Sequence, residues 1–369
     1  MDIGVLTFGE VTTDPRTGRT PSPRQRVADT IEQMRVADQV GLDVYGVGEH
    51  HRGDFIASAT SVLLAGGATV TERIRLASAV TVLSSEDPVR VYEQYATLDL
   101  LSGGRAEIMA GRGSYTESFP LFGYDLQDYN ELFDEKLDLL LTIRSQNPVT
   151  WQGVFRPPLE AADIAPRALQ DPLPIWQAVG GTPASAYHAG ARGIPMMIAF
   201  LVGPIGAHAR MVDYYHMGAE QAGVSPEHLR IGASVHGFVG KTSQDARDTM
   251  FPYFSRGMRE NNHQRGVGFD VPRRAFDAQA GPAGMPVVGS PQEVIDKIMA
   301  YREIYGIDRI MMQMGFGGVP QKDHLRAIEL LGTEVAPVLR RETDDGTAES
   351  PSSQIPENAS EQGNPEAIR

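Results

Sequence analysis

Residues 174–200 read PIWQAVGGTPASAYHAGARGIPMMIAF and contain the pattern that decides the fold. Two short apolar runs, Pro174–Val179 and Pro195–Phe200, lie on either side of a segment that starts with Thr182-Pro183. Threonine is a favoured N-cap and proline a favoured first residue of a helix, so we predict that a helix begins here. A strand, a helix and a second strand in this order are typical of parallel strands joined by a crossover helix.

The same alternation continues along the chain in both directions. Helical periodicity is present, for example, at Arg24–Val40, Pro88–Leu101 and Asn130–Ile143. The apolar runs, eight in all, are Ile3–Phe8, Val44–Val47, Ile74–Leu83, Ala106–Ala110, Pro174–Val179, Pro195–Phe200, Ile231–Val239 and Ile307–Met314. Near-continuous apolar strands between helices indicate a parallel sheet covered on both faces. We therefore predict an α/β fold, a closed (β/α)8 TIM barrel, with an open doubly wound sheet as the alternative.

The barrel is predicted to be a single domain over residues 1–341, with two long connections. Asn147–Asp171, after the fourth strand and its helix, is rich in proline and is predicted to be a surface insertion. Arg259–Ser290 is rich in glycine, proline and arginine and has no steady period, so we expect a lid or a disordered loop beside the barrel mouth. Residues 342–369 are acidic and poor in apolar side chains, which predicts a disordered tail without a role in catalysis.

The composition excludes several classes of protein. The 369 residues contain no cysteine, which excludes disulfides, thiolate metal sites and cysteine nucleophiles. A net charge of −14 argues against a general nucleic-acid binder. The chain has no basic leader and no apolar run long enough for a membrane-spanning helix. We therefore expect a soluble, cytoplasmic protein that binds neither nucleic acid nor membranes.

The second predicted strand ends in Glu49-His50-His51, three ionisable side chains where a barrel of this kind carries its catalytic groups. Because neighbouring residues of an extended chain point in opposite directions, one histidine is expected to face the mouth while the other supports the wall. The alternative is that both are hydrogen-bonded structural residues. The spacings His-x-His and His-Glu-x-x-His are absent, so we expect no metal site.

The fourth and fifth predicted strands end in glycine-rich turns. In Gly111-Arg112-Gly113 the glycines let the backbone turn sharply and bring the guanidinium to an anion. Thr116 stands where a dinucleotide fingerprint requires its third glycine, so that motif is absent. Gly180–Ser185 leads into a helix whose free amides make a cradle for a phosphate group. The alternatives are an arginine in a surface turn and an ordinary strand-to-helix connection.

Taken together, these fragments resemble the luciferase-like flavin-dependent monooxygenases of the bacterial luciferase superfamily. The fragments are Glu49-His50-His51, Asp87-Pro88-Val89-Arg90, Leu101–Arg105, Gly111–Tyr115, the Gly181–Ser185 turn and Gly193–Met196. Each fragment is common alone, whereas their combination in register with the strands is specific. The likeness extends from Met1 to about Arg341.

The resemblance implies a site for FMN. The phosphate would be held by the Arg112 side chain, the turn Gly180, Gly181 and Thr182, and the Ser185 hydroxyl, with Ser114 and Tyr115 beside the cofactor and Ala79 and Val80 behind its isoalloxazine ring. A non-prolyl cis peptide is implied at Ser78-Ala79 or Ala79-Val80. His50 would be the catalytic acid and base, supported by His51 and Glu49. Luciferases carry a carboxylate at the position of Gly181, so aldehyde luminescence is not implied.

The activity implied by the resemblance is an FMN-dependent monooxygenase that uses O2 and receives reduced FMN from a separate flavin reductase. A homodimer is also implied. Two alternatives stay open: a flavin- or deazaflavin-dependent reductase or dehydrogenase, and a non-catalytic flavin-binding barrel. The Gly-Arg-Gly-Ser turn favours FMN over a deazaflavin. The substrate is left open, although the side chains predicted to line the mouth, Phe8, Phe200, Phe238 and Met314, favour an apolar or aromatic molecule.

Overall fold

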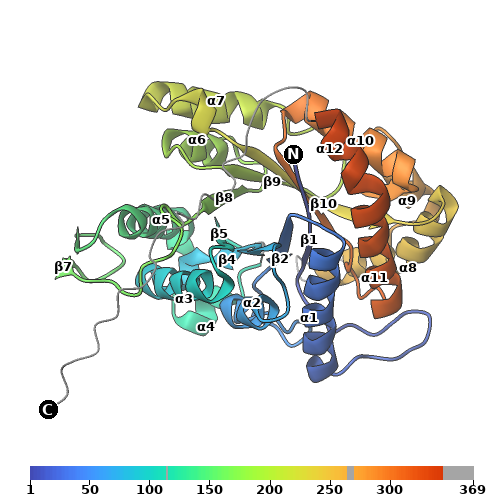
Figure 1. Ribbon diagram of the computed structural model, residues 1–369, viewed down its shortest axis with the longest axis horizontal. Helices are drawn as coiled ribbons and strands as arrows, with labels where there is room; N and C mark the ends of the chain where they lie inside the picture. The colour runs from blue at the N-terminus through green and yellow to red at the C-terminus, as the bar shows by residue number, and fades with distance from the viewer. Residues whose placement is uncertain (114, 264–269, 344–369) are drawn as a thin grey trace, which may run out of the picture.

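The computed structural model describes residues 1–113, 115–263 and 270–343, and within them the chain forms a closed parallel barrel (Figure 1). Strand β12 (Arg309–Gln313) closes the barrel by pairing with β1 (Asp2–Thr7). Between these two lie β2 (Val44–Val47), β3 (Arg75–Ser78), β5 (Ala106–Gly111), β8 (Ile175–Val179), β9 (Met196–Phe200) and β10 (Ile231–Val239). The eight predicted runs correspond to these strands of the described chain. The TIM barrel is therefore confirmed, and the open sheet is excluded.

Helices surround the barrel on its outer side (Figure 1). They are α1 (Pro23–Gln39), α2 (Thr60–Ala68), α3 (Pro88–Ser102), α4 (Ser118–Phe122), α5 (Tyr129–Ser145), α6 (Pro183–Ala191), α7 (Arg210–Ala222), α8 (Ser243–His263), α9 (Arg273–Ala280), α10 (Pro291–Tyr305), α11 (Gln321–Leu330) and α12 (Ala336–Thr343). The N-cap of α3 is Asp87, whose carboxylate accepts a hydrogen bond from the Val89 amide at 2.9 Å. Over the described residues, no helix has the length and apolar character needed to cross a membrane.

The third predicted run forms two strands rather than one. β3 ends at Ser78, and β4 (Thr81–Val82) follows a cis peptide bond between Ala79 and Val80. β4 pairs with the end of β5, so the break keeps the run within the barrel wall. The cis bond is at one of the two positions that the resemblance implied, and that prediction is confirmed.

The two long connections have structure of their own. Within Asn147–Asp171, β6 (Val149–Trp151) and β7 (Leu159–Ala162) pair as an antiparallel hairpin set away from the barrel (Figure 1). The described part of Arg259–Ser290 contains α9 and β11 (Val287–Gly289), which pairs with the end of β10. It is therefore not the disordered loop we considered; α9 was missed because an eight-residue helix is too short for a clear period. Residues 264–269 lie outside the described residues.

The C-terminal helix α12 runs to Thr343, two residues beyond the boundary predicted for the domain. It is held to the barrel by the buried side chain of Leu339 and by Arg340, which pairs with Asp43 at 3.0 Å. Residues 344–369, which make up most of the predicted tail, lie outside the described residues.

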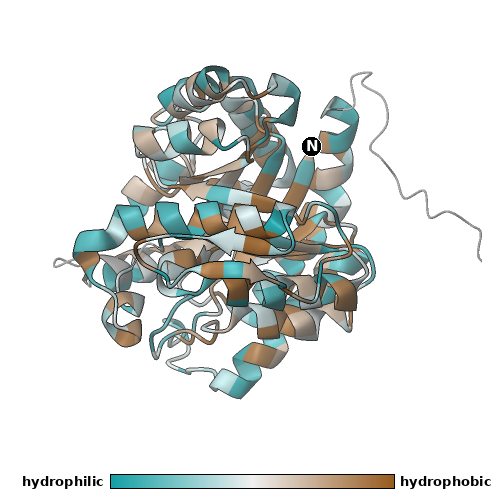
Figure 2. Ribbon diagram, turned by 90° about the vertical axis from the view of Figure 1, so that its left-hand side faces the viewer, coloured by the Kyte–Doolittle hydropathy of each residue, from teal (hydrophilic) through white to brown (hydrophobic). Residues whose placement is uncertain are grey.

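Apolar side chains fill the barrel and the layer between strands and helices. In Figure 2, hydrophobic colour is concentrated on the strands in the middle of the molecule, while the outer helices carry more of the hydrophilic colour. The barrel interior is filled by Leu6, Val44, Ala77, Ala79, Met109, Trp176, Met197 and Met311, with Phe8 packed at its end. Phe200 instead packs against Tyr301 and Tyr305 of the outer helix α10. Our prediction that it lines the mouth was wrong, because alternate residues of each strand face the helices. The same role for Phe238 and Met314 stays a prediction.

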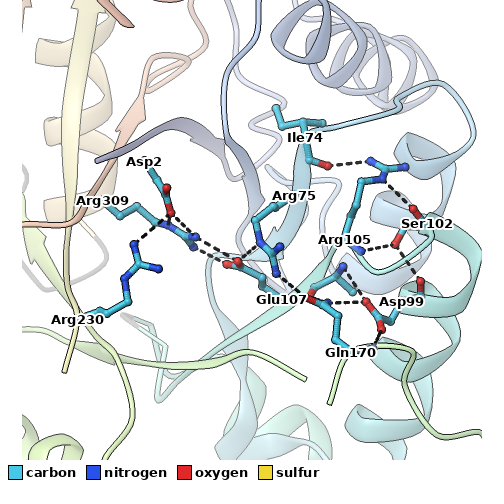
Figure 3. Close-up of polar contacts among 11 residues, drawn as sticks. Asp2, Ile74, Arg75, Asp99, Ser102, Arg105, Glu107, Gln170, Arg230 and Arg309 are labelled. Carbon is cyan, nitrogen blue, oxygen red and sulfur yellow. Dashed lines mark hydrogen bonds and ion pairs between the residues drawn. The ribbon is translucent and has the colours of Figure 1, made fainter. Parts of the chain in front are cut away.

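An ion-pair network lies at the end of the barrel where the strands begin (Figure 3). Arg309 on β12 donates to Glu107 on β5 and, at 2.8 Å, to Asp2 on β1, and Arg75 on β3 also pairs with Glu107. The Arg309 guanidinium lies 4.4 Å from the centre of the Trp176 ring. Burial opposes the ionisation of Glu107, but Arg309 and Arg75 together hold its pKa at about 2. This end is closed by salt bridges, which leaves the opposite end for a ligand.

Candidate active site

The carboxyl end of β2 places Glu49 and His51 in contact with each other. Glu49 Oε1 lies 2.7 Å from His51 Nε2, and Glu49 Oε2 accepts a hydrogen bond from the Val82 amide at 2.9 Å. The Glu49 amide donates to the Val80 carbonyl at 3.0 Å. The hydrogen bond with Glu49 raises the pKa of His51. Glu49 thus orients His51 and fixes the backbone on both sides of Val80, whereas His50 has other partners.

His50 is buried in a ring of aromatic side chains at the mouth of the barrel. Its imidazole centroid lies 4.8 Å from that of Phe8, 4.4 Å from Phe55 and 5.0 Å from Tyr115. Its Nδ1 lies 3.3 Å from Glu117 Oε1, and the same carboxylate oxygen accepts from the His51 amide at 3.4 Å. The two histidine side chains therefore have different surroundings. The Glu117 carboxylate contacts both residues, through the ring of His50 and the backbone amide of His51.

Glu117 was not identified from the sequence. Burial would raise the pKa of its carboxyl group, but the hydrogen bond with His50 and those with backbone amides lower it below the usual value. Glu117 is therefore a charged partner for His50. Glu117 lies five positions after Arg112, just before the short helix α4. Its contact with His50 forms because this loop folds back over the end of β2, which the sequence does not reveal. The one sequence feature that could have pointed to Glu117 is its position soon after the glycine-rich turn.

The turns after β5 and β8 meet at Arg112 and Ser185. Arg112 Nη1 donates to Ser185 Oγ at 3.1 Å, and the guanidinium stacks 4.3 Å from the centre of the Phe133 ring. A second contact, 3.8 Å from Nη2 to Asp134 Oδ1, is at the outer limit of an ion pair. Arg112 Nε is buried and has no hydrogen-bond partner among the residues the structure describes. Burial lowers the pKa of Arg112, as expected of a cation held without a close anion.

The turn before α6 has the form that the sequence predicted. Thr182 is the N-cap, Pro183 is the first helical residue, and the Thr182 side chain makes no capping bond in the described chain. Gly181 has a φ of +98°, and a Cβ atom there would lie 3.0 Å from Cε1 of His208. Both facts favour glycine at this position. The Ser185 hydroxyl in the first turn of α6 contacts Arg112, so the start of this helix lies beside the guanidinium.

The remaining predicted residues lie between these two groups. Ala79 is buried in the barrel interior and Val80 is half-buried. A Cβ atom at Gly111 would lie 2.9 Å from the Val80 side chain, so the glycine lets β5 approach the cis peptide. The Tyr115 ring contacts His50 and lies 5.0 Å from the Arg52 guanidinium. Ser114 lies outside the described residues.

A cavity of about 440 Å³ opens at the mouth between the loop after β1 and helix α8, lined in part by Thr12 and Arg256. A narrower pocket of about 20 Å³ lies next to it and shares its lining residue Thr12; its other walls include Phe8, Phe55 and Phe316. No group of three or more histidine, aspartate or glutamate side chains arranged to bind a metal occurs in residues 1–113, 115–263 and 270–343. The mouth thus combines a cationic turn, a buried histidine and an aromatic pocket.

Fold and sequence together define an oxidoreductase of the barrel type that works with a bound organic cofactor. Residues 1–308 match the family model of the luciferase-like monooxygenases, and the chain belongs to this family. A relative, the oxygenase component of a flavin-dependent trigonelline monooxygenase from Acinetobacter baylyi, is 24% identical over 77% of this chain and 82% of its own. The recognition of the family from the sequence is thereby confirmed.

Solved structures show the same fold. The monooxygenase RslO1 from Streptomyces bottropensis matches with a TM-score of 0.78 and 24% identity, covering 92% of this chain and 99% of that one. The oxygenating constituent of 3,6-diketocamphane monooxygenase from Pseudomonas putida, in complex with FMN, gives 0.69 and 22%, covering 91% and 98%. A coenzyme F420-dependent tetrahydromethanopterin reductase from Methanopyrus kandleri gives 0.68 and 19%, covering 92% and 99%. Neighbours of both cofactor classes therefore share this barrel.

Proposed function

We propose that the protein is an FMN-dependent monooxygenase that uses reduced FMN and O2 to oxidise a small organic substrate. The observation that carries the proposal is the meeting of two turns, at 3.1 Å between Arg112 Nη1 and Ser185 Oγ, around a buried guanidinium nitrogen that lacks a partner within the described chain. Buried donors of this kind are normally satisfied, and a phosphate monoester would satisfy it. Ser185 lies in the first turn of α6, so the positive end of this helix's dipole would also favour a phosphate here.

The residues present fit FMN. Its phosphate would be held by Arg112, by the turn Gly180, Gly181 and Thr182, and by the Ser185 hydroxyl, while Ser114 and Tyr115 would lie beside it and Ala79 and Val80 behind its ring. Bound reduced FMN supplies the two electrons that activate O2, with one oxygen atom entering the substrate and the other leaving as water. The protein's part is to bind, to orient and to exclude water.

His50 is proposed as the proton donor and acceptor. Imidazole exchanges protons near neutral pH, and the aromatic side chains around His50 keep bulk water from its ring. Glu117, 3.3 Å from Nδ1, would hold the ring in one orientation and leave Nε2 for the reacting molecules. Glu49 and His51 would support the site indirectly, because they fix the strand end and the backbone at Val80.

The choice of FMN over a deazaflavin rests on two supports: the short Gly-Arg-Gly turn around Arg112 and the FMN bound to a structural neighbour. The F420-dependent neighbours support the second candidate function, a hydride-transfer reductase or dehydrogenase. Anaerobic titration with NADPH separates the two functions. Bleaching of bound flavin by NADPH alone would favour the reductase.

The direct test mixes the protein with photoreduced FMN and then with oxygenated buffer, and follows the flavin absorbance. A monooxygenase site excludes water and should slow reoxidation relative to free flavin. If reduced FMN reoxidises equally fast in the presence and in the absence of the protein, the proposal is contradicted. The same result with the protein still binding oxidised FMN would favour a non-catalytic flavin-binding barrel.

The proposal includes a separate reductase and a homodimer. A relative is named as an oxygenase component, which supports delivery of reduced flavin by another protein. Exposed apolar side chains on α2 and α3, namely Val62 (71% exposed), Leu100 and Leu101, support burial against a second copy. Sedimentation equilibrium of the protein, compared with a Val62→Lys variant, tests the dimer. The cytoplasmic location expected from the sequence stays a prediction.

A further inference from the structure

The narrow pocket beside the rings that surround His50 has a polar inner end. Its walls are largely aromatic, with Phe8, Phe55 and Phe316 among them, and it shares Thr12, Asp54 and Glu260 with the larger cavity. A volume of about 440 Å³ suits the body of a small ligand, whereas about 20 Å³ holds one group the size of a water molecule. The shape therefore favours a molecule with a bulky body and one small polar end.

Glu10 is the residue at the inner end. Its side chain lines the pocket although the residue is only 5% exposed. Oε1 accepts a hydrogen bond from Gln313 Nε2 at 3.2 Å, while Oε2 has no hydrogen-bond partner among the described residues. A buried carboxyl oxygen without a partner is unfavourable, so a ligand that donates a hydrogen bond to it gains free energy on binding.

Glu10 is held in place from behind by the barrel strands. Gln313 on β12 lies in register with His236 on β10, and its side chain reaches the His236 ring. Burial lowers the pKa of His236 to about 4, so this histidine is neutral at neutral pH. Burial also raises the pKa of Glu10, although nearby Arg26 opposes the rise. The position of Glu10 is thus fixed by groups on rigid strands, as a recognition site requires.

The other charged side chains around the two cavities already have partners. Asp54 pairs with Arg52, Glu260 with Arg256 at 2.6 Å, and Arg259 with Asp270 at 2.9 Å. Within the described residues, no ion pair satisfies Glu10. In the part of the chain that the structure describes, a ligand entering the pocket therefore meets aromatic walls, neutralised charges and two side-chain oxygens without a partner, Glu10 Oε2 and Thr12 Oγ1.

We propose that Glu10 selects the substrate: the inner pocket takes a hydroxyl or amino hydrogen-bond donor of an aromatic or alicyclic molecule whose body lies among the aromatic rings. The proposal rests on the proposed function, since it names the substrate class of the same site. A molecule whose polar end is a carboxylate should bind poorly, because it offers no hydrogen-bond donor to Glu10 Oε2 and would lose its hydration in a pocket with aromatic walls.

The test measures binding of four probes that share a benzene ring and differ in the group attached to it: benzylamine, benzyl alcohol, toluene and benzoate. Saturation-transfer NMR is recorded on the full chain with FMN added, on Glu10→Gln, and on a matched Glu227→Gln control, whose carboxylate is exposed. We expect benzylamine and benzyl alcohol to bind the unaltered protein better than benzoate. In Glu10→Gln the amide N–H would face the donor, so both should bind about tenfold more weakly while toluene is unchanged.

Two results would overturn the proposal: equal binding of benzylamine and benzoate by the unaltered protein, or unchanged affinity for all probes in Glu10→Gln. If Glu10→Gln fails to fold, the order of the probes on the unaltered protein decides. Titration of the same samples with FMN keeps this test apart from that of the cofactor. Loss of FMN binding by the unaltered protein would contradict the proposed function, whereas the probe order reports on the pocket alone.

Discussion

At the scale of single residues, the proposed FMN site predicts that cofactor binding depends most on Arg112. Replacing it with glutamine removes the cation but keeps a similar length. Since a hydrogen bond to a charged group contributes about 1.5–3 kcal/mol, the affinity for FMN should fall by roughly ten- to a hundredfold. Quenching of FMN fluorescence measures this, with Arg210→Gln on the outer helix α7 as the matched control. Equal affinities of the two variants would remove the basis of the phosphate site.

The pair Glu49–His51 makes a second residue-scale prediction. Because the pKa of His51 is raised in the folded state, its stabilising effect is complete below about pH 6.5 and is lost as the pH rises through the raised pKa. In Glu49→Gln the pKa of His51, followed by NMR of the ring protons, should fall. Thermal stability should then lose that part of its pH dependence, whereas Glu227→Gln should keep it. A His51 titration unaffected by the substitution would show that the contact is not formed in solution.

Sequence motifs predicted some residues of the candidate site. Residues that reach the site only through contacts between loops were not predicted. Arg112 and Ser185 follow from glycine-rich turns at neighbouring strand ends, and the 3.1 Å contact joins them. Glu117 and Glu10 lie in irregular segments, where side-chain direction depends on how a loop folds. Neither periodicity nor capping specifies that direction, so their contacts with His50 and Gln313 had to come from coordinates.

At the scale of elements, the strands were predictable because each is a buried apolar run, whereas breaks within them were not. The third run is one pattern in the sequence but two strands in the fold, divided at Ala79-Val80. Helix α9 was not predicted, because its eight residues give little more than two turns and so no clear helical period. Alternation along a strand fixes two faces but not which is inner, and this is why Phe200 was placed on the wrong side.

Strands β5 and β12 are joined by Glu107 and Arg309, and this pair gives a prediction for acid stability (Figure 3). The pKa of Glu107 is about 2 in the folded state, against 4.5 for an ordinary glutamate. Its stabilising effect is therefore present above about pH 4.5 and is lost as the pH falls toward 2. Glu107→Gln should lower the free energy of unfolding at pH 7 by about 3–5 kcal/mol, because it leaves Arg309 and Arg75 without their shared anion.

Urea denaturation at several pH values measures this effect. The difference between Glu107→Gln and the unaltered protein should shrink as the pH approaches 2. Glu160→Gln, in the exposed strand β7, serves as the control and should match the unaltered protein throughout. A constant difference across the pH range would show that Glu107 acts through packing rather than through its charge.

At the scale of the whole molecule, we expect the stability of the barrel to depend on α12. Leu339 is buried, and Arg340 of α12 pairs with Asp43 beside the first barrel strands. A chain ending at residue 343 should therefore keep its melting temperature and its affinity for FMN. A chain ending at residue 335 loses the Leu339 contact, worth about 2–5 kcal/mol in cores of this kind, and should melt several degrees lower. Because the FMN turns lie on β5 and β8, away from α12, the shorter chain should still bind FMN at low temperature. Loss of FMN binding already on removal of residues 344–369 would instead assign the tail a part in the site.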